Sequence, residues 1–417
     1  MEDKSFKPLF SVPVIVAALG YFVDIYDLLL FSIVRVPSLK SLGYTDPAAL
    51  QKMGEYLINS QMAGLLVGGL IWGILGDKKG RLSVLFGSII LYSSANIANG
   101  FVHTVDQYAV FRFIAGVGLA GELGAGITLV AEILPVRLRG YGTTIVASVG
   151  VLGAVVANFV TKSFDHWEHA YFIGGGLGFV LLIARVSIFE SGIFLTLKNT
   201  AVKRGNVLQL FTNAARFRKF MGCIFIGLPI WFAIGVLMTF SPEFGKALHI
   251  TEPILAGNAI MFSYIGLSIG DLGSGLISQW MRSRKKVILL FIILSLLSFC
   301  LYLFMPVRSA EFFYACCFLI GISIGYWALF VTVAAEQFGT NLRSTVATTV
   351  PNMIRGTVIP LTVTFKFVRE ALGKNAPSET AYIQGACWIA LATIVIAVIA
   401  LQLIDETFSR DLNYIEN

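Results

Sequence analysis

The sequence predicts an all-α membrane protein in which twelve transmembrane helices form two pseudo-repeated six-helix halves. Composition is the first observation behind this prediction. Of the 417 residues, 56% are hydrophobic and only 13% are charged, and the mean hydropathy is +0.79. Soluble domains carry about 25% charged residues. So few charges cannot cover a water-facing surface, which excludes a soluble enzyme, a disordered chain and a secreted disulfide scaffold.

The second observation is the spacing of apolar runs. A helix needs about 20 apolar residues to cross a bilayer. Twelve such runs occur, at about 10–35, 54–75, 83–101, 106–133, 142–162, 169–188, 219–240, 254–277, 287–305, 311–335, 345–367 and 382–404. The first run is too long for the core of a secretory signal, so we expect no cleavable signal peptide.

Lysine and arginine residues between these runs predict the orientation. If the N-terminus is cytoplasmic, 19 of them lie in cytoplasmic segments and seven on the opposite side. Because positive charge concentrates on the cytoplasmic side, we expect both termini in the cytoplasm and a location in a bacterial inner membrane. The net charge of +7 therefore predicts orientation and gives no indication of a nucleic-acid partner.

The third observation is an internal repeat. Gly73-x-x-Gly-Asp77 ends the second run and Gly275-x-x-x-Gln279 ends the eighth, 202 residues later. A glutamate with an arginine seven residues on occurs at the end of the fourth and of the tenth run, 204 residues apart. We expect an N-terminal six-helix bundle at 1–188, a cytoplasmic basic linker at 189–218 and a C-terminal six-helix bundle at 219–417, with a site between the halves.

The segment from Gly73 to Arg81, with Gly76, Asp77 and Gly80, resembles the signature loop of the major facilitator superfamily. The resemblance implies transport by alternating access and a cytoplasmic latch of ion pairs at helix ends. The gating residues expected for this latch are Asp77, Arg81, Glu132, Arg139, Glu336 and Arg343. The structural alternative is a solvated loop that caps two helices.

The first and fourth runs narrow the resemblance. Gly20-x-x-x-Asp24-x-Tyr26-Asp27 and the Gly121-Glu122 region are similar to motifs of the metabolite:proton symporters. The Asp-x-Tyr-Asp form also resembles the phosphate:proton and aromatic-acid:proton branches. The fifth run lacks the Gly-Pro motif of drug antiporters, and no phosphate-binding loop of an ATP-driven pump occurs in the sequence.

Three carboxylates near mid-depth are the expected proton-coupling residues: Asp24, Asp27 and Glu122. Charged groups in a bilayer cost at least about 2.5–3.5 kcal/mol each, so they are functional candidates. Asp24 and Asp27 share one helical face and cannot both ionise easily, which suits a proton carrier. The structural alternatives are an ion pair for the aspartates and an interhelical clamp for Glu122.

Arg355 is the one cation near mid-depth in the second half, and we expect it to hold an anionic group of the substrate. The alternative is a structural partner for Asp271 or for a first-helix aspartate. The other residues expected to contact the substrate are Tyr26, Trp231, Tyr326, Trp327 and Asn352.

These residues predict a proton-coupled symporter that imports a small carboxylate-bearing solute, an amino acid or an organic acid. The alternatives are a phosphate:proton or an aromatic-acid:proton symporter. A non-transporting membrane sensor is disfavoured because we expect no appended output domain. The protein is expected to be a monomer in the lipid bilayer, with protons and a small solute as partners, and neither an enzyme nor a holder of a cofactor, metal or nucleic acid.

Overall fold

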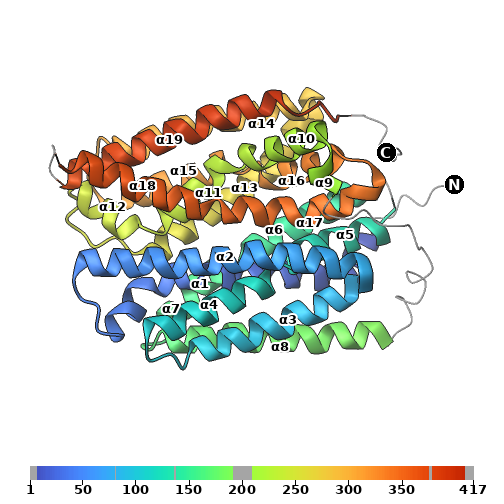
Figure 1. The fold of residues 1–417 in the computed structure, drawn as a ribbon, viewed down its shortest axis with the longest axis horizontal. Coiled ribbons are helices and arrows are strands. Elements are labelled where there is room, and N and C mark those ends of the chain that lie inside the picture. The colour runs from blue at the N-terminus through green and yellow to red at the C-terminus, as the bar shows by residue number, and fades with distance from the viewer. Residues whose placement is uncertain (1–6, 80, 136–137, 191–208, 375–377, 409–417) are drawn as a thin grey trace.

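The computed structural model describes residues 7–79, 81–135, 138–190, 209–374 and 378–408, although not every side chain within them (Figure 1). Helices make up nearly all of these residues, and the described part contains no strand. Most of the helices run roughly along one long axis. The all-α membrane architecture predicted from the sequence is confirmed.

In the described part of the first half, a short 3-10 segment, η1 (Lys7–Phe10), precedes eight helices. They are α1 (Val12–Ser41), α2 (Pro47–Lys79), α3 (Arg81–Asn99), α4 (Val105–Leu119), α5 (Glu122–Ile133), α6 (Arg139–Val151), α7 (Gly153–Ser163) and α8 (Glu168–Glu190).

The described residues of the second half form eleven further helices and one π-helical segment. They are α9 (Gln209–Thr212), α10 (Ala214–Ile226), α11 (Leu228–Phe232), the π-helical η4 (Ala233–Met238), α12 (Ser241–Ala247), α13 (Ala256–Met281), α14 (Arg284–Leu303), α15 (Ala310–Ser323), α16 (Trp327–Glu336), α17 (Thr340–Gly356), α18 (Val358–Leu372) and α19 (Ser378–Gln402).

Within the described residues, nine helical stretches are long and apolar enough to cross a membrane. The remaining predicted spans, 83–101, 106–133 and 345–367, correspond to α3, to α4 with α5, and to α17 with α18. The last two spans are each broken into two shorter helices near their middle. All twelve predicted spans are therefore helical, and the chain has the expected twelve-helix plan.

The breaks repeat between the halves. The fourth span breaks after α4, whose C-cap is Ala120, and the tenth breaks after α15, whose C-cap is Ile324, 204 residues later. The fifth span breaks at Leu152 and the eleventh at Thr357, 205 residues later. These offsets match the spacing of the sequence repeat, so the two halves share their local geometry as well as their pattern.

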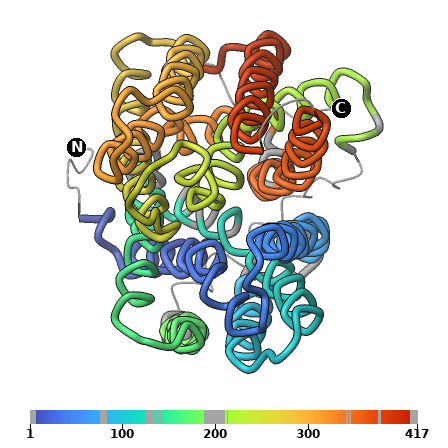
Figure 2. The backbone as a smooth tube through the Cα atoms, turned by 90° about the vertical axis from the view of Figure 1, so that its left-hand side faces the viewer, coloured from blue at the N-terminus to red at the C-terminus, as the bar shows by residue number. Residues whose placement is uncertain are grey.

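The two halves lie side by side, as the end-on view in Figure 2 shows. Helix α1 contacts α13, and α2 contacts α17 and α18, so these helices join the halves. The packing is close: a Cβ on Gly356 of α17 would collide with the Leu66 side chain of α2. Leu66, a residue of the other half, thus fills the space beside Gly356.

The long axis of the molecule has a proximal end and a distal end. The proximal end is where α1 begins and α19 ends, and the distal end is where α1 ends and α2 begins (Figure 1). Local sequence explains where α1 starts and stops: Pro13 lies in its first turn at the proximal end, and at the distal end the helix ends before Gly43, whose φ of 91° favours glycine.

Candidate functional site

The two halves are joined near mid-depth by one buried ion pair. Arg355 of α17 donates from Nη2 to Oδ2 of Asp24 on α1, at 3.2 Å, and both side chains are at most 1% exposed. The pair leaves hydrogen-bonding capacity unused. Asp24 Oδ1 and Arg355 Nε and Nη1 have no partner among the described residues. A guanidinium grips a carboxylate best through two parallel bonds, so this pair is only partly satisfied.

Two predicted aromatic residues lie beside Arg355. Its Cζ atom is 6.0 Å from the ring centre of Trp231, and Trp231 packs against Trp327 at 6.3 Å with an interplanar angle of 71°. Trp327 in turn donates its indole N–H to the hydroxyl of Tyr21 on α1, at 3.3 Å. The guanidinium therefore faces an aromatic wall. Tyr21 belongs to this wall, although the sequence did not predict it as a site residue.

The other predicted contact residues use their polar atoms elsewhere. The hydroxyl of Tyr26 donates to the Ala170 carbonyl at 2.9 Å, and that of Tyr326 to the Ile226 carbonyl at 3.0 Å. Both bonds stay within one half of the molecule. Asn352 donates to the Ala120 carbonyl at 2.8 Å, where the fourth span breaks, so it joins the halves.

Asp271 was an alternative partner for Arg355, and the structure places it differently. Its Oδ1 accepts the backbone N–H of Ala328 at 2.9 Å, near the start of α16. A carboxylate at a helix N-terminus is favoured by the helix dipole. Arg355 pairs with the first-helix Asp24 instead.

Glu122 is held within the first half by Arg185 of α8. Both carboxylate oxygens accept from it: Nη1 bonds Oε1 at 3.1 Å and Nη2 bonds Oε2 at 2.8 Å. Ser88 adds a third hydrogen bond at 2.8 Å. The sequence interpretation did not single out Arg185, although an arginine in an otherwise uncharged run was a usable signal.

Asp27 faces its own half, away from the Asp24–Arg355 pair. Its Oδ1 lies against Gly174 of α8, where a Cβ would collide with it. Neither of its oxygens has a hydrogen-bond partner in the part of the chain that the structure describes. Buried Arg112 donates to Gln61 and, at 3.5 Å, to Tyr171. Asp24 therefore contacts the second half, at Arg355, whereas Asp27 lies against α8 of its own half.

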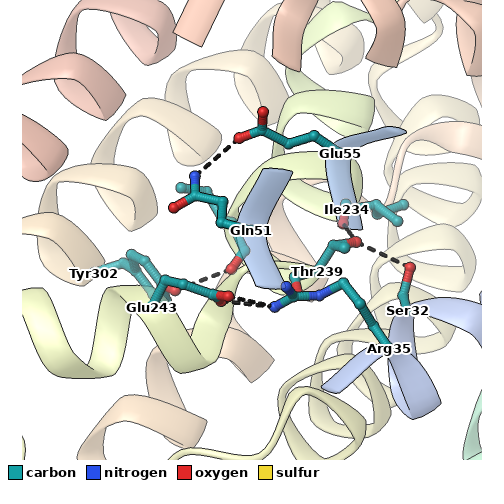
Figure 3. Close-up of polar contacts among 9 residues, drawn as sticks. Ser32, Arg35, Gln51, Glu55, Ile234, Thr239, Glu243 and Tyr302 are labelled. Atoms are coloured by element: carbon teal, nitrogen blue, oxygen red, sulfur yellow. Dashed lines mark hydrogen bonds and ion pairs between the residues drawn. The ribbon is translucent and has the colours of Figure 1, made fainter. Parts of the chain in front are cut away.

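A second pair between the halves lies toward the distal end (Figure 3). Arg35 of α1 donates from Nη2 to both oxygens of Glu243 on α12, at 2.8 and 2.7 Å, and its Cζ is 4.7 Å from the Phe240 ring. Beside it, Thr239 donates to the hydroxyl of Ser32 at 3.1 Å. An arginine at the end of the first apolar run was a usable signal for Arg35, but the sequence indicates no partner for it.

The predicted gating residues lie at the proximal end. The side chains of Asp77, Arg81, Glu132, Arg139 and Arg343 lie outside the described residues, so the latch remains a prediction. Glu336 is described, and it accepts from Arg284 of α14 at 2.9 Å. That bond lies within the second half.

No three His, Cys, Asp or Glu side chains gather as metal ligands among the described residues. All five cysteines are unpaired. The chemistry available at mid-depth is therefore that of ion pairs, hydrogen bonds and aromatic faces.

Comparison with known proteins gives the family and the fold. The model of the Major Facilitator Superfamily matches residues 16–361. The proton:xylose symporter XylE has a solved structure that superposes with a TM-score of 0.70 over 98% of both chains, at 14% identity. At that identity the likeness concerns the fold alone.

Several curated transporters are similar in sequence. A putative metabolite transport protein of Haemophilus influenzae is 33% identical over 45% of each chain. The benzoate transport protein of Acinetobacter baylyi is 28% identical over 46% of this chain and 42% of its own length. A putative niacin/nicotinamide transporter of Bacillus subtilis is 25% identical over 79% and 81%. The chain thus matches less than half the length of the first two relatives.

The family match covers most of the chain, and the relatives and the fold agree with it. They agree with an integral membrane protein of a family whose members are transporters and not enzymes. The chain belongs to the major facilitator superfamily.

Proposed function

We propose that the protein is a proton-coupled symporter that imports a small aromatic carboxylate by alternating access. The observation that carries this proposal is the buried Asp24–Arg355 pair, which joins the two halves at mid-depth through one contact of 3.2 Å. Aromatic rings flank the pair, and relatives of the chain are named as benzoate and gentisate transporters.

The pair suggests how a proton and a substrate are coupled. Arg355 stays charged at any physiological pH, so in a low-dielectric interior it needs one carboxylate partner. When Asp24 takes up a proton it loses its attraction for Arg355, and the substrate carboxylate takes its place. Substrate and proton then enter together, and the site keeps the same net charge whether it is empty or loaded.

The aromatic walls favour the aromatic-acid alternative over an amino acid. Trp231 and Trp327 present ring faces and edges beside the guanidinium. Rings of this kind pack edge-to-face or offset against another ring and add about 0.5–1.5 kcal/mol beyond area burial. An amino acid would also bring an ammonium group next to Arg355, and like charges repel.

The orientation in the membrane is inferred from the positive-inside pattern of the sequence. That pattern favours a proximal end on the cytoplasmic side and a distal end on the outer side of the membrane. The Arg35–Glu243 pair then holds the outer side closed, and the predicted latch around Asp77 holds the inner side. Asp27 and Glu122 remain further candidates for proton binding, but Asp24 is the carboxylate that competes with the substrate.

Proton uptake on ligand binding tests the proposal. Purified protein in weakly buffered detergent is titrated with benzoate, 4-hydroxybenzoate and nicotinate while a pH dye reports protons. Wild type is expected to take up about one proton per carboxylate bound at the central site, because the displaced Asp24 becomes protonated. Asp24→Asn is expected to bind the ligand with no proton uptake.

The matched control is Asp271→Asn, which removes another buried carboxylate that does not contact Arg355. It should keep the proton uptake of wild type. Unchanged proton uptake in Asp24→Asn would contradict the coupling. Inorganic phosphate in the same titration addresses the phosphate alternative: competition by phosphate against the aromatic acids would favour that branch.

A further inference from the structure

A cavity of about 1010 Å³ opens at the distal end between the two halves. Its walls come from α1, α2, α12, α18 and α19, and they include Val36 and Glu243, so the cavity borders the Arg35–Glu243 pair. Along α1, Val36 is twelve residues from Asp24, or about 18 Å at 1.5 Å per residue. This distal cavity is therefore separate from the central ion pair.

Positive charge predominates in the distal cavity. Six basic residues line it: Lys40, Lys52, Lys246, Lys366, Arg369 and Lys374. Four acidic residues oppose them: Glu55, Glu243, Glu370 and Glu379. Glu243 is already neutralised by Arg35, which raises the positive excess. A concave surface with one predominant sign of charge concentrates ions of the opposite sign, so the cavity attracts anions.

Arg369 of α18 is the group in this cavity best arranged to bind a carboxylate. Its Cζ lies 5.6 Å from the Phe365 ring and 5.3 Å from the Tyr382 ring, which orient the guanidinium. Its nearest carboxylate oxygen, on Glu55, is 3.9 Å away, too far for a hydrogen bond. Its Nη1 has no hydrogen-bond partner among the residues described. The guanidinium is thus positioned, yet keeps donors available.

We infer that the distal cavity is a capture site for a small aromatic carboxylate, which Arg369 binds before the molecule passes the Arg35–Glu243 pair. The inference rests on the proposed function, which supplies the substrate class and the outward direction of this end. The carboxylate would take two parallel hydrogen bonds from the guanidinium. The ring of the ligand would lie against Tyr382 and the apolar wall that includes Leu50 and Ala247.

Binding stoichiometry tests this inference independently of transport. Purified full-length protein is dialysed to equilibrium against 4-fluorobenzoate. The amount of bound ligand is then measured by ¹⁹F NMR. Wild type is expected to bind two equivalents. Arg355→Ala should lose the central one and keep the other, and the double variant with Arg369→Gln should bind none. Because the distal cavity is open to solvent, its equivalent should also weaken at least several-fold between low salt and 0.5 M salt.

Controls separate this inference from the proposed function. Arg308→Gln removes an exposed arginine that is not part of the cavity, and it should keep both equivalents. If Arg369→Gln folds poorly, Arg369→Lys takes its place. This variant keeps the charge and should bind the distal equivalent with reduced affinity. One equivalent in wild type and none in Arg355→Ala would overturn the capture site alone. Two equivalents in both proteins would overturn the central role of Arg355, and no binding in wild type would overturn both proposals.

Discussion

Two buried arginine–carboxylate pairs in this molecule have the same chemistry and opposite degrees of satisfaction. The Glu122–Arg185 pair lies within one half, and both of its oxygens and two of its nitrogens are bonded. The Asp24–Arg355 pair joins the halves through a single bond of 3.2 Å. The hydroxyl of Ser88 adds a further hydrogen bond to the first pair, whereas the second pair faces aromatic rings.

The difference indicates which pair changes partners during transport. A buried ion pair with all its bonds made is costly to separate, because each ion would be left without its partner in low dielectric. A pair with one long bond and unused donors loses less when a new carboxylate arrives. We infer that Glu122–Arg185 fixes the first half as a rigid body, while Asp24–Arg355 exchanges ligands between the halves.

The largest expected effect comes from removing Arg355. Losing a buried charged partner costs about 3–5 kcal/mol, so Arg355→Ala should weaken carboxylate binding at the central site by two to three and a half orders of magnitude. Arg355→Lys should lose less, because it keeps the charge without the planar grip. Binding of benzoate and benzamide is compared in one detergent. Equal losses for acid and amide would assign Arg355 to the scaffold.

The next effect concerns stability and compares the two pairs directly. Glu122→Gln leaves Arg185 charged and unpaired, so it should destabilise the protein by about 3–5 kcal/mol. Combining it with Arg185→Gln should recover most of that loss. Asp24→Asn should cost clearly less, since the pair that it breaks makes one long bond. Thermal unfolding at one scan rate measures all three, and the comparison is wrong if Asp24→Asn lowers the midpoint as much as Glu122→Gln.

A smaller effect is expected at the distal pair. Hydrogen bonds to a charged group contribute about 1.5–3 kcal/mol, and Glu243 is 17% exposed, which lowers this value. Glu243→Gln should therefore shift the population toward a distally open state and increase labelling of Ser32→Cys in a background without the natural cysteines. Glu252→Gln, at an exposed distal position, is the control. Unchanged labelling of Ser32→Cys would mean that the Arg35–Glu243 bond does not control opening.

The smallest effect concerns Glu406, which follows α19 outside the predicted spans. Burial would raise its pKa, but hydrogen bonds from Ser283 Oγ and from the backbone N–H groups of Phe408, Arg284 and Lys285 outweigh burial and hold the pKa below 4.5. Its stabilising contribution is therefore complete above the unfolded value of about 4.5 and is lost as the pH falls through the lower folded value.

Glu406→Gln should accordingly lower the unfolding midpoint slightly at pH 7 and leave it unchanged at the acid end, near pH 3. Glu379→Gln, at an exposed position, serves as the control because its carboxylate pairs with a similarly exposed His249, at 3.4 Å. An equal loss from Glu406→Gln at both pH values would show that the carboxylate charge contributes nothing.

The sequence was sufficient for the fold because the apolar runs follow from the lipid environment. The length of each run sets the span, and the Gly and charge motifs identify the family. The breaks inside the spans were not predicted, although glycines lie beside them: Gly121 follows Ala120, and Gly150 and Gly153 flank Leu152. Glycine is also frequent inside unbroken transmembrane helices, so these residues alone do not indicate a break.

The candidate site was predictable in its residues but not in its pairs. A charge in an apolar run identifies Asp24 and Arg355 as candidates, but the sequence cannot choose a partner 331 residues away. Glu243 was missed for a different reason. It lies just after the apolar run at 219–240, where a carboxylate reads as an ordinary surface residue, and only the approach of α1 reveals its role.

The π-helical segment at Ala233–Met238 has a consequence for how this chain tolerates changes in length. In a regular α-helix, Trp231 and Thr239 would be turned about 80° apart, since eight residues rotate by about 800°. A π-bulge absorbs one residue of that rotation and brings Thr239 back toward the face that carries Trp231. The bond from the Thr239 N–H to the Ile234 carbonyl, five residues earlier, marks this extra residue. Deleting one residue from a membrane-spanning helix ordinarily rotates everything beyond it, but here a deletion between Ala233 and Met238 converts the bulge to α-helix and preserves both faces.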